Sequence, residues 1–426
     1  DSDVNISTAT WTHRFSPTSE LRTAVRYGDY QRSYWARTPS ATVAPGDTGL
    51  NLPSTNAGPT RSMDYETVTV QSDYNTRFRA FDMKHELVAG IEYLHEDSHR
   101  SGLRNLGGTT ADNPPLFRPY VENTAGAVNF TGDSYAIYAQ DTVEFLPFWK
   151  LTLGARRDEL KAEYSSATSP QLEYGEWSTR AALSYQPNDQ AHYYLGYSDS
   201  FSPTADLYQL TLAPLPPETS EVVEAGAKWM FLDGDLTFRT AIYRATKHWE
   251  RNTDLESTAA ILTNKRRTDG IEFEAAGRIT PDWEVFAGLA LMDSKILQVA
   301  YNHDGSDANA DPDIADPRFA GQRARNTPKY TFNLWSTYRL GHGWKIGGGV
   351  EAKGDRYAYS PSAQPGASVD ALFPGGGFKP NTAPAYARWD AMVSYEQKRW
   401  AARLNVQNLF DEVYYDAVYD NGSFSV

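Results

Sequence analysis

The connections between the predicted strands of this chain alternate between tight turns and long polar loops. Tight turns are predicted at Ser16-Pro17-Thr18, Asp82-Met83-Lys84, Pro147-Phe148, Pro187-Asn188-Asp189, Asp233-Gly234, Thr280-Pro281-Asp282, Gly341-His342-Gly343 and Gln397-Lys398. Long loops are predicted around residues 38–64, 97–131, 163–175, 200–219, 249–262, 300–325 and 357–384. A sheet with this alternation has two unlike ends, and transmembrane β-barrels are built in this way.

The side chains of the predicted strands alternate between apolar and polar with a period of two. In residues 149–156 the odd positions are apolar, and residues 283–291 and 344–351 show the same alternation. Such a period is typical of a β-strand that presents two different faces. The pattern predicts an all-β fold with about sixteen antiparallel strands joined as hairpins.

The polar face of these strands carries too many charges for a dry core. Its members include Lys150, Arg156, Arg239, Glu272, Glu274, Glu284, Lys345, Glu351, Lys353 and Arg403. Burying each of them unpaired would cost several kcal/mol. A wide, water-filled lumen removes this cost. A soluble β-propeller is the alternative, but it would show a recurring signature about every 40–50 residues, and none recurs in the chain.

Composition narrows the possible functions. The chain has 426 residues and no linker-like segment, so one domain over residues 1–426 is expected. Cysteine is absent, which excludes disulfides and thiolate chemistry. The net charge of −14 argues against binding to nucleic acid, because phosphate recognition needs a basic surface. No apolar run reaches the roughly 20 residues of a membrane helix. Aromatic residues make up 13%, a content that fits both interfacial girdles and ligand-binding loops.

Several segments resemble the barrel of TonB-dependent outer-membrane receptors. They run in the family's order along nearly the whole chain: residues 135–142, 149–157, 194–203, 217–228, 269–274, 326–330 and 404–414. The Asn326-Thr327-Pro328 segment is most similar to siderophore receptors, and residues 25–39 resemble the catecholate type more softly.

The resemblance implies a plugged outer-membrane barrel of about 22 strands in a Gram-negative bacterium. In that family TonB, with ExbB and ExbD, drives import through the plug, so long loops would be extracellular and tight turns periplasmic. The implied partners are a ferric siderophore, outer-membrane lipid and lipopolysaccharide. The chain departs from the pattern because the plug, the TonB-contacting box, about five strands and the last strand are missing. We therefore expect a barrel domain that is incomplete at both ends.

Two motifs that suggest metal sites have simpler interpretations. His95-Glu96-Asp97-Ser98-His99 has the H-E-x-x-H pattern of zinc proteases, which requires a helix. Here it follows the alternating segment 87–94 and leads into a predicted loop, and extended backbone would separate the histidines by about 13 Å. Residues 304–313 resemble the start of a calcium loop but lack its glycine, so a solvated acidic loop is favoured. We expect no metal site, cofactor or catalytic residue.

Basic and aromatic side chains gather at the bases of the long loops. Arginine supplies charge and a stacking plane, and aromatic rings supply faces, so the set suits a planar anionic ligand such as a ferric catecholate. The predicted ligand-binding residues are Arg32, Tyr34, Trp35, Arg37, His99, Arg100, Arg104, Trp249, Arg251, Arg356 and Tyr357. The alternative for each single residue is a contact with lipopolysaccharide phosphate or a neighbouring acid.

The expected function is TonB-driven import of a ferric siderophore, with iron carried by the ligand and no covalent chemistry. A passive, substrate-selective outer-membrane channel is one alternative. The same receptor fold serving haem, cobalamin, nickel or an oligosaccharide is another.

Overall fold

The fold is known from a computed structural model, which describes residues 2–35, 60–105, 120–165, 171–202, 217–251, 261–299, 320–324, 326–358, 381–418 and 424–425. The strands of the main sheet are β1 (Ser2–Ser16), β2 (Ser19–Trp35), β3 (Thr60–Ala80), β4 (Met83–Asn105), β5 (Tyr120–Leu146), β6 (Trp149–Tyr164), β7 (Gln171–Asn188), β8 (Ala191–Ser202), β9 (Glu218–Phe231), β10 (Leu236–Arg251), β11 (Ile261–Thr280), β12 (Trp283–Val299), β13 (Tyr330–Gly341), β14 (Trp344–Lys353), β17 (Tyr386–Glu396) and β18 (Ala401–Val406). Short strands β15 (Arg356–Ala358) and β16 (Asn381–Ala383) form one small ladder, and β19 (Ala417–Val418) and β20 (Phe424–Ser425) form another. A single 3-10 turn, η1 (Leu232–Gly234), interrupts the strands of the described residues, and none of their helical segments is long and apolar enough to cross a membrane.

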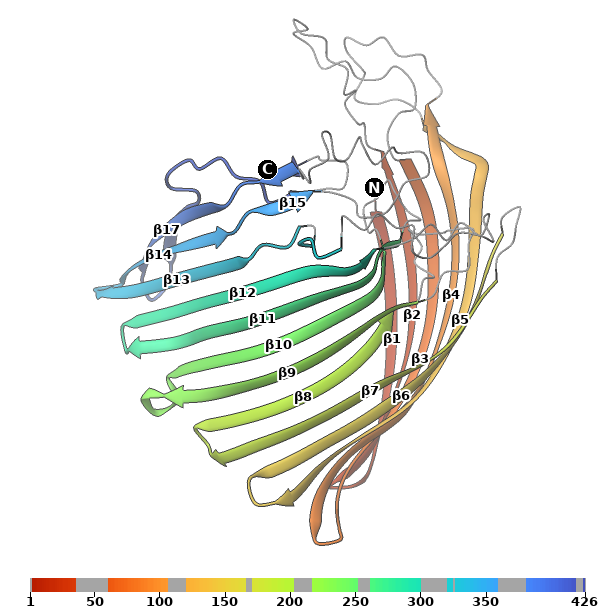
Figure 1. The fold of residues 1–426 in the computed structure, drawn as a ribbon, viewed down its shortest axis with the longest axis horizontal. Coiled ribbons are helices and arrows are strands. Elements are labelled where there is room, and N and C mark those ends of the chain that lie inside the picture. The colour runs from red at the N-terminus through yellow and green to blue at the C-terminus, as the bar shows by residue number, and fades with distance from the viewer. Residues whose placement is uncertain are drawn as a thin grey trace, which may run out of the picture.

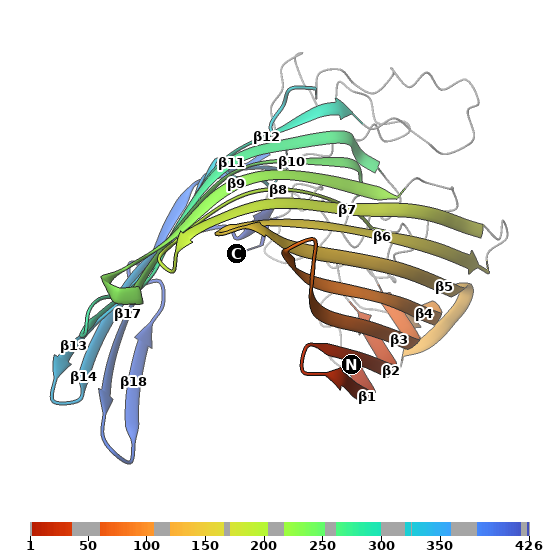
Figure 2. The ribbon, with the colours of Figure 1, turned by 90° about the horizontal axis from the view of Figure 1, so that it is seen from below.

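The main sheet has 16 strands, and each pairs with its neighbours in chain order (Figure 1). Every pairing in it is antiparallel, and a tight turn joins the two strands of each hairpin at the positions predicted from the sequence. Figure 2 shows the sheet as an arch with β1 and β18 at its two ends. The predicted architecture and the strand number are therefore confirmed.

One predicted loop is much shorter than expected. The sequence predicts a loop over residues 97–131, but β4 continues to Asn105 and β5 begins at Tyr120. The H-E-x-x-H segment consequently lies inside β4, in extended backbone, and the prediction that it leads into a loop is wrong. Glu96 to His99 are polar on both faces, so the alternation that marks a strand disappears there while the backbone pairing continues.

The two faces of the sheet differ as the alternation predicts. Leu289 and Phe332 are directly opposed on β12 and β13, and they share the apolar face with the Leu151–Leu183 pair. On the other face, Lys345 lies 3.6 Å from Glu284. Side chains that are directly opposed in an antiparallel pair lie on the same face of the sheet. The register therefore tells, strand by strand, which residues lie on the apolar face and which lie on the charged face.

The charged face is the inner, concave one. Arg156 on β6 reaches Glu92 on β4 at 3.2 Å, and Tyr138 on β5 donates to Asp73 on β3. Both contacts skip a strand, as inward curvature allows when it brings side chains together. The segment that follows β18 also crosses this face, where Arg388 donates to the Tyr414 hydroxyl at 3.0 Å. The arch therefore encloses polar side chains and turns apolar ones outward.

Tyrosine rings on the inner face lie over glycines of the adjacent strand. The residue pairs are Tyr138 with Gly90, Tyr194 with Gly226 and Tyr243 with Gly270, which are opposed in register. A Cβ built on Gly226 would lie 2.5 Å from the Tyr194 ring. The missing side chain thus makes room for the ring, and the Tyr194 hydroxyl reaches Glu224.

Aromatic rings line the outer face close to the tight turns. Trp149 stacks on Tyr185 with ring centroids 4.5 Å apart, and contacts of 5.9 to 6.4 Å continue the series. Its further members are Tyr193, Trp229, Phe238 and Phe273. Rings with one apolar and one wettable part favour a membrane–water interface. The series marks the tight-turn edge of an apolar outer band.

Candidate ligand-binding site

Two of the predicted ligand-binding arginines lie in one row on the inner face, at the loop end of the arch. Arg32 on β2 is opposite Met63 on β3, and Met63 is opposite Arg100 on β4. Adjacent strands are about 4.8 Å apart, so the two arginine backbones are about 10 Å apart. Between them Met63 offers a flexible, polarizable surface.

Aromatic side chains surround this row. The Arg32 guanidinium lies 5.1 Å from the centre of the Tyr34 ring. One inner-face step closer to the tight turns, Tyr30 and Tyr65 have ring centroids 5.6 Å apart, and the Tyr65 hydroxyl donates to Glu96. Cationic groups beside ring faces can hold a planar anion by charge and by stacking. The row and these rings form the candidate ligand-binding site.

Other predicted residues lie elsewhere. His99 belongs to the outer face of β4, where its Nδ1 is 2.6 Å from the Asn129 side-chain oxygen. Trp249 lies near the end of β10 with a left-handed φ of 55°. Tyr357 lies on the short strand β15, and its ring centre is 3.8 Å from the guanidinium carbon of Arg323. The structure therefore does not bring these three residues to the Arg32–Arg100 row.

The remaining predictions near loop ends are only partly placed. The strands β2, β4 and β10 end at or next to Trp35, Arg104 and Arg251. The side chains of these three residues are not among those that the structure describes. Arg37 and the acidic loop at 304–313 lie outside them entirely.

Arg356 has an anchoring position instead of an exposed one. Its side chain is 2% exposed. Nη1 donates to the Asp416 carbonyl oxygen at 2.5 Å, and Nη2 donates to the carbonyl oxygen of Tyr415. The guanidinium thereby ties β15 to the segment after β18. Ligand contact was predicted from its place beside a loop, and the sequence contains no signal for this burial because the partners lie about 60 residues away.

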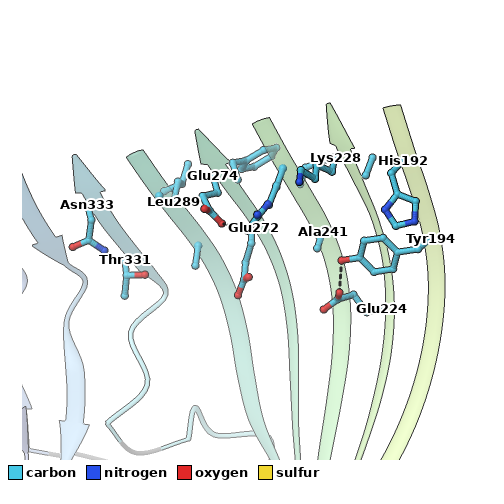
Figure 3. Close-up of a pocket in the computed structure, with 16 residues that line it drawn as sticks. His192, Tyr194, Glu224, Lys228, Ala241, Glu272, Glu274, Leu289, Thr331 and Asn333 are labelled. Atoms are coloured by element: carbon cyan, nitrogen blue, oxygen red, sulfur yellow. Dashed lines mark hydrogen bonds and ion pairs between the residues drawn. The ribbon is translucent and has the colours of Figure 1, made fainter. Parts of the chain in front are cut away.

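A second feature of the inner wall is a groove of about 630 Å³ across β8 to β13 (Figure 3). His192, Lys228, Arg239 and Glu274 follow one another in register along it. Small residues at Ala241, Gly288 and Ala290 contribute to its lining. The alternation in the sequence predicts the polar face for Arg239, Glu272 and Glu274, but it does not predict the groove, because small residues on separate strands contribute to its lining.

The groove presents charges of both signs. Arg239 Nη1 lies 3.6 Å from Glu274, and the Tyr194 hydroxyl donates to Glu224. Such a wall suits polar contacts with a polypeptide or a hydrated ligand. Among the described residues, no group of three or more His, Asp or Glu side chains is arranged to hold a metal ion.

Comparisons with known proteins agree with the fold. Residues 1–409 match the family described as "TonB dependent receptor-like, beta-barrel". The probable TonB-dependent receptor BfrD of Bordetella pertussis is 31% identical over 319 residues, which cover 70% of this chain and 40% of that protein. The probable TonB-dependent siderophore receptor PiuA of Acinetobacter baumannii is 26% identical over 397 residues, covering 84% and 50%.

Solved structures share the architecture. The crystal structure of PiuA from Acinetobacter baumannii superimposes with a TM-score of 0.79 at 22% identity, covering 100% of this chain and 62% of that one. The crystal structure of the ferric-catecholate import receptor Fiu of Escherichia coli K12 superimposes with a TM-score of 0.76 at 21% identity, covering 99% of this chain and 62% of that one. The chain spans about half the length of the curated relatives it matches. The chain belongs to the TonB-dependent receptor β-barrel family, whose members are outer-membrane transport receptors of Gram-negative bacteria and not enzymes.

Proposed function

We propose that residues 1–426 form the barrel domain of a receptor that imports a ferric siderophore, with a catecholate-type ligand favoured. The observation that carries this proposal is the row Arg32–Met63–Arg100 with the rings of Tyr30, Tyr34 and Tyr65 beside it. A ferric catecholate is anionic and has flat aromatic edges, so the arginines would attract it and the rings would pack against it. The relatives named as siderophore receptors support the same substrate class.

The transport step needs parts beyond this wall. A plug in the lumen would receive the ligand from the loop-end site, and TonB with ExbB and ExbD would supply the energy. The loop end would be extracellular and the tight turns periplasmic, and outer-membrane lipid with lipopolysaccharide would surround the apolar face. In this scheme the barrel binds, orients and encloses the ferric complex, and iron is cargo carried by the ligand.

The test combines ligand binding with growth under iron limitation. In the full-length receptor, the double variant Arg32→Ala, Arg100→Ala should weaken ferric-catecholate binding by about 100-fold, because each lost charge-assisted contact is worth about 1.5–3 kcal/mol. Arg26→Ala is the matched control, since Arg26 is exposed on the same face of β2 but lies nearer the tight turn. Unchanged affinity in the double variant would remove this row from the site.

Panels of ligands and an energy block separate the alternatives. Growth should depend on the receptor with a ferric siderophore as the iron source, and short-term uptake of the ferric siderophore past the outer membrane should stop when the proton gradient is collapsed. Uptake that persists without the gradient would indicate a passive channel. Dependence on haem, cobalamin, nickel or an oligosaccharide in place of a ferric chelate would change the substrate class.

A further inference from the structure

Two large aromatic side chains face inward on a wall that is mostly polar. Phe286 on β12 is directly opposite Trp335 on β13, and the row continues to Gly349 on β14 and Asp390 on β17. Asp390 pairs with Arg388 on the inner face, so the two rings lie on that face as well. Phe286 is 58% exposed, and Trp335 is half-buried. Apolar rings gain free energy when they leave water, so a pair of rings in a wet lumen indicates a surface that takes part in binding.

Glycines on the neighbouring strands make room around these rings. A Cβ built on Gly349 would lie 2.6 Å from the Trp335 ring, and a Cβ built on Gly347 would lie 3.2 Å from it. Gly288, on the same strand as Phe286, has no heavy atom within 4 Å of its Cβ position. The missing side chains therefore let the Trp335 ring lie close to β14 and leave open space beside Phe286.

The rings and glycines enclose a small pocket. Phe286, Trp335, Gly288 and Gly349 line a recess of about 370 Å³, which we call the aromatic recess. It adjoins the groove across β8 to β13, because Gly288 lines both. Five polar residues also line it: Glu274, Asn333, Glu351, Arg388 and Asp390. A concave site with apolar walls and a few polar groups is typical of small-molecule binding.

The charges at the rim of the aromatic recess are already paired. Arg388 Nη2 lies 3.0 Å from Glu351 and 3.1 Å from Asp390, and Arg239 Nη1 lies 3.6 Å from Glu274. Net charge is therefore not what selects a ligand here. Arg388 nonetheless has a buried Nε without a hydrogen-bond acceptor among the described residues. A donor buried in this way costs stability, and an oxygen atom of a ligand would offset that cost by accepting its hydrogen bond.

We propose that the aromatic recess binds an aromatic ring that carries oxygen substituents, such as a catechol ring. Phe286 and Trp335 would pack against the ring, and Arg388 Nε would donate to one of its oxygens. The recess lies toward the tight turns, because β12 begins only three residues before Phe286. The ring would belong to a ferric catecholate that has left the Arg32–Arg100 row, and this assignment rests on the proposed function.

The first experiment measures catechol binding to the full-length receptor in nanodiscs by ligand-observed NMR. The receptor carries Arg32→Ala and Arg100→Ala, so that binding at the loop end does not contribute. Adding Phe286→Ala with Trp335→Ala should weaken catechol binding by at least about 10-fold, because both ring contacts are lost. Cyclohexane-1,2-diol has the oxygens without the aromatic ring, and it should bind at least about 10-fold more weakly than catechol.

An aromatic pair on the other face of the same two strands provides the matched control. Trp283 and Tyr338 are directly opposed on the outer face of β12 and β13, and Trp283→Ala with Tyr338→Ala should leave catechol binding unchanged. Trp335→Phe keeps a ring in the recess and should retain binding. Unchanged catechol affinity after Phe286→Ala with Trp335→Ala, an equal loss in the control, or equal binding of cyclohexane-1,2-diol would each overturn the proposal.

A separate variant tests the hydrogen bond from Arg388. Arg388→Lys keeps the positive charge but removes Nε–H, so it should weaken binding of catechol several-fold and leave binding of toluene, which has no oxygen, unchanged. Equal effects on the two probes would overturn the role of Arg388.

Uptake measurements separate this proposal from the proposed function. With Arg32 and Arg100 intact, the variant Phe286→Ala, Trp335→Ala should keep its affinity for a ferric catecholate but take the complex up several-fold more slowly. An unchanged uptake rate would overturn the assignment of the ring to the transported ligand. Catechol binding in the recess without receptor-dependent growth on any ferric chelate would leave the site in place and refute the siderophore function instead.

Discussion

An arginine on the inner face of the sheet has different surroundings from an arginine on the outer face. Two adjacent residues of β6 show the difference. Arg156 faces inward and bridges Glu92 at 3.2 Å and Asp158 at 2.8 Å. Arg157 faces outward at the end of the apolar run, paired with Glu159 and 5.8 Å from the Trp177 ring centre. Charges occur along the whole inner wall because water can wet it. On the outer face of β6 they begin only where the apolar band ends.

The strongest way to break this comparison is to put a charge into the apolar band. Leu153 faces outward between Trp149 and Arg157 and is 54% exposed. Leu153→Arg should destabilise the full-length receptor in lipid vesicles by about 2–4 kcal/mol, the cost of arginine near the midplane. Guanidinium unfolding in vesicles measures it.

The adjacent residue provides the control. Thr152 faces inward, opposite Thr142, and its hydroxyl is 2.9 Å from that of Thr142. Thr152→Arg should cost less than about 1 kcal/mol, because the new charge meets the wet wall. Equal losses in the two variants would contradict the assignment of faces.

A second test sharpens the description of the inner face, where rings occupy glycine positions. Gly226→Ala should destabilise the receptor by about 1–3 kcal/mol through overpacking against Tyr194, whose ring lies 2.5 Å from the added Cβ. Gly288→Ala is the control, because nothing lies within 4 Å of its Cβ position. Adding Tyr194→Ala should cancel most of the effect of Gly226→Ala, and strict additivity in this double-mutant cycle would argue against the contact.

A smaller effect distinguishes the two arginines of β6. Arg156→Ala leaves Glu92 and Asp158 without their shared cation and should cost about 1 kcal/mol, since partial exposure screens the pair. Arg157→Ala, on the outer edge, should cost less than about 0.5 kcal/mol. The same unfolding assay measures both variants, and a larger loss for Arg157 would reverse the comparison.

The smallest expected effect concerns pH at the segment after β18. Lys353 donates to Asp416 at 2.9 Å and holds the pKa of Asp416 below its ordinary value of 3.8. Because the carboxyl pKa is lower in the folded state than in the unfolded state, the ionised carboxylate stabilises the folded state above pH 3.8. This stabilisation is lost as the pH falls through the lower pKa of the folded state. Because Asp416 is 62% exposed, the effect should stay under about 1 kcal/mol.

Hydrogen exchange at residues 411–416 reports this contact. Protection should fall as the pH is lowered below 4, after correction for intrinsic rates, and Asp416→Asn should remove the pH dependence. If protection against exchange in Asp416→Asn depends on pH in the same way as in the native chain, another group is responsible for the effect.

Local patterns were enough to predict the hairpins and their faces. Tight-turn residues such as Asp233-Gly234 determine where strands reverse, and the period of two in residues 149–156 determines which side chains point inward. These signals are contained in a few consecutive residues. The loop at 97–131 was overestimated because Glu96 to His99 are polar on both faces, and only the neighbouring strands show that pairing continues there.

The candidate site was predicted only in part for a related reason. The charge of Arg32 and Arg100 and their place near loops predict ligand contact, and the register puts the two residues in one row. Arg356 fits the same description but is buried by carbonyl groups of residues 415 and 416. Whether an arginine faces ligand or anchors backbone depends on partners far along the chain, which residue type and position do not reveal.

The order of the strands has a consequence for how the wall is built. Every strand of the main sheet pairs with the main-sheet strand before or after it in the sequence, and only the small β15–β16 ladder intervenes, between β14 and β17. Each hairpin can therefore be added to the one before it without threading through earlier parts. The sheet can therefore assemble by adding one hairpin after another along the chain. For the same reason, gain or loss of one hairpin during evolution leaves the other pairings intact. The contact of Lys353 with Asp416 spans 63 residues. The strands β17 and β18 lie between these two residues in the sequence, so the contact ties the segment after the last strand of the main sheet back to β14.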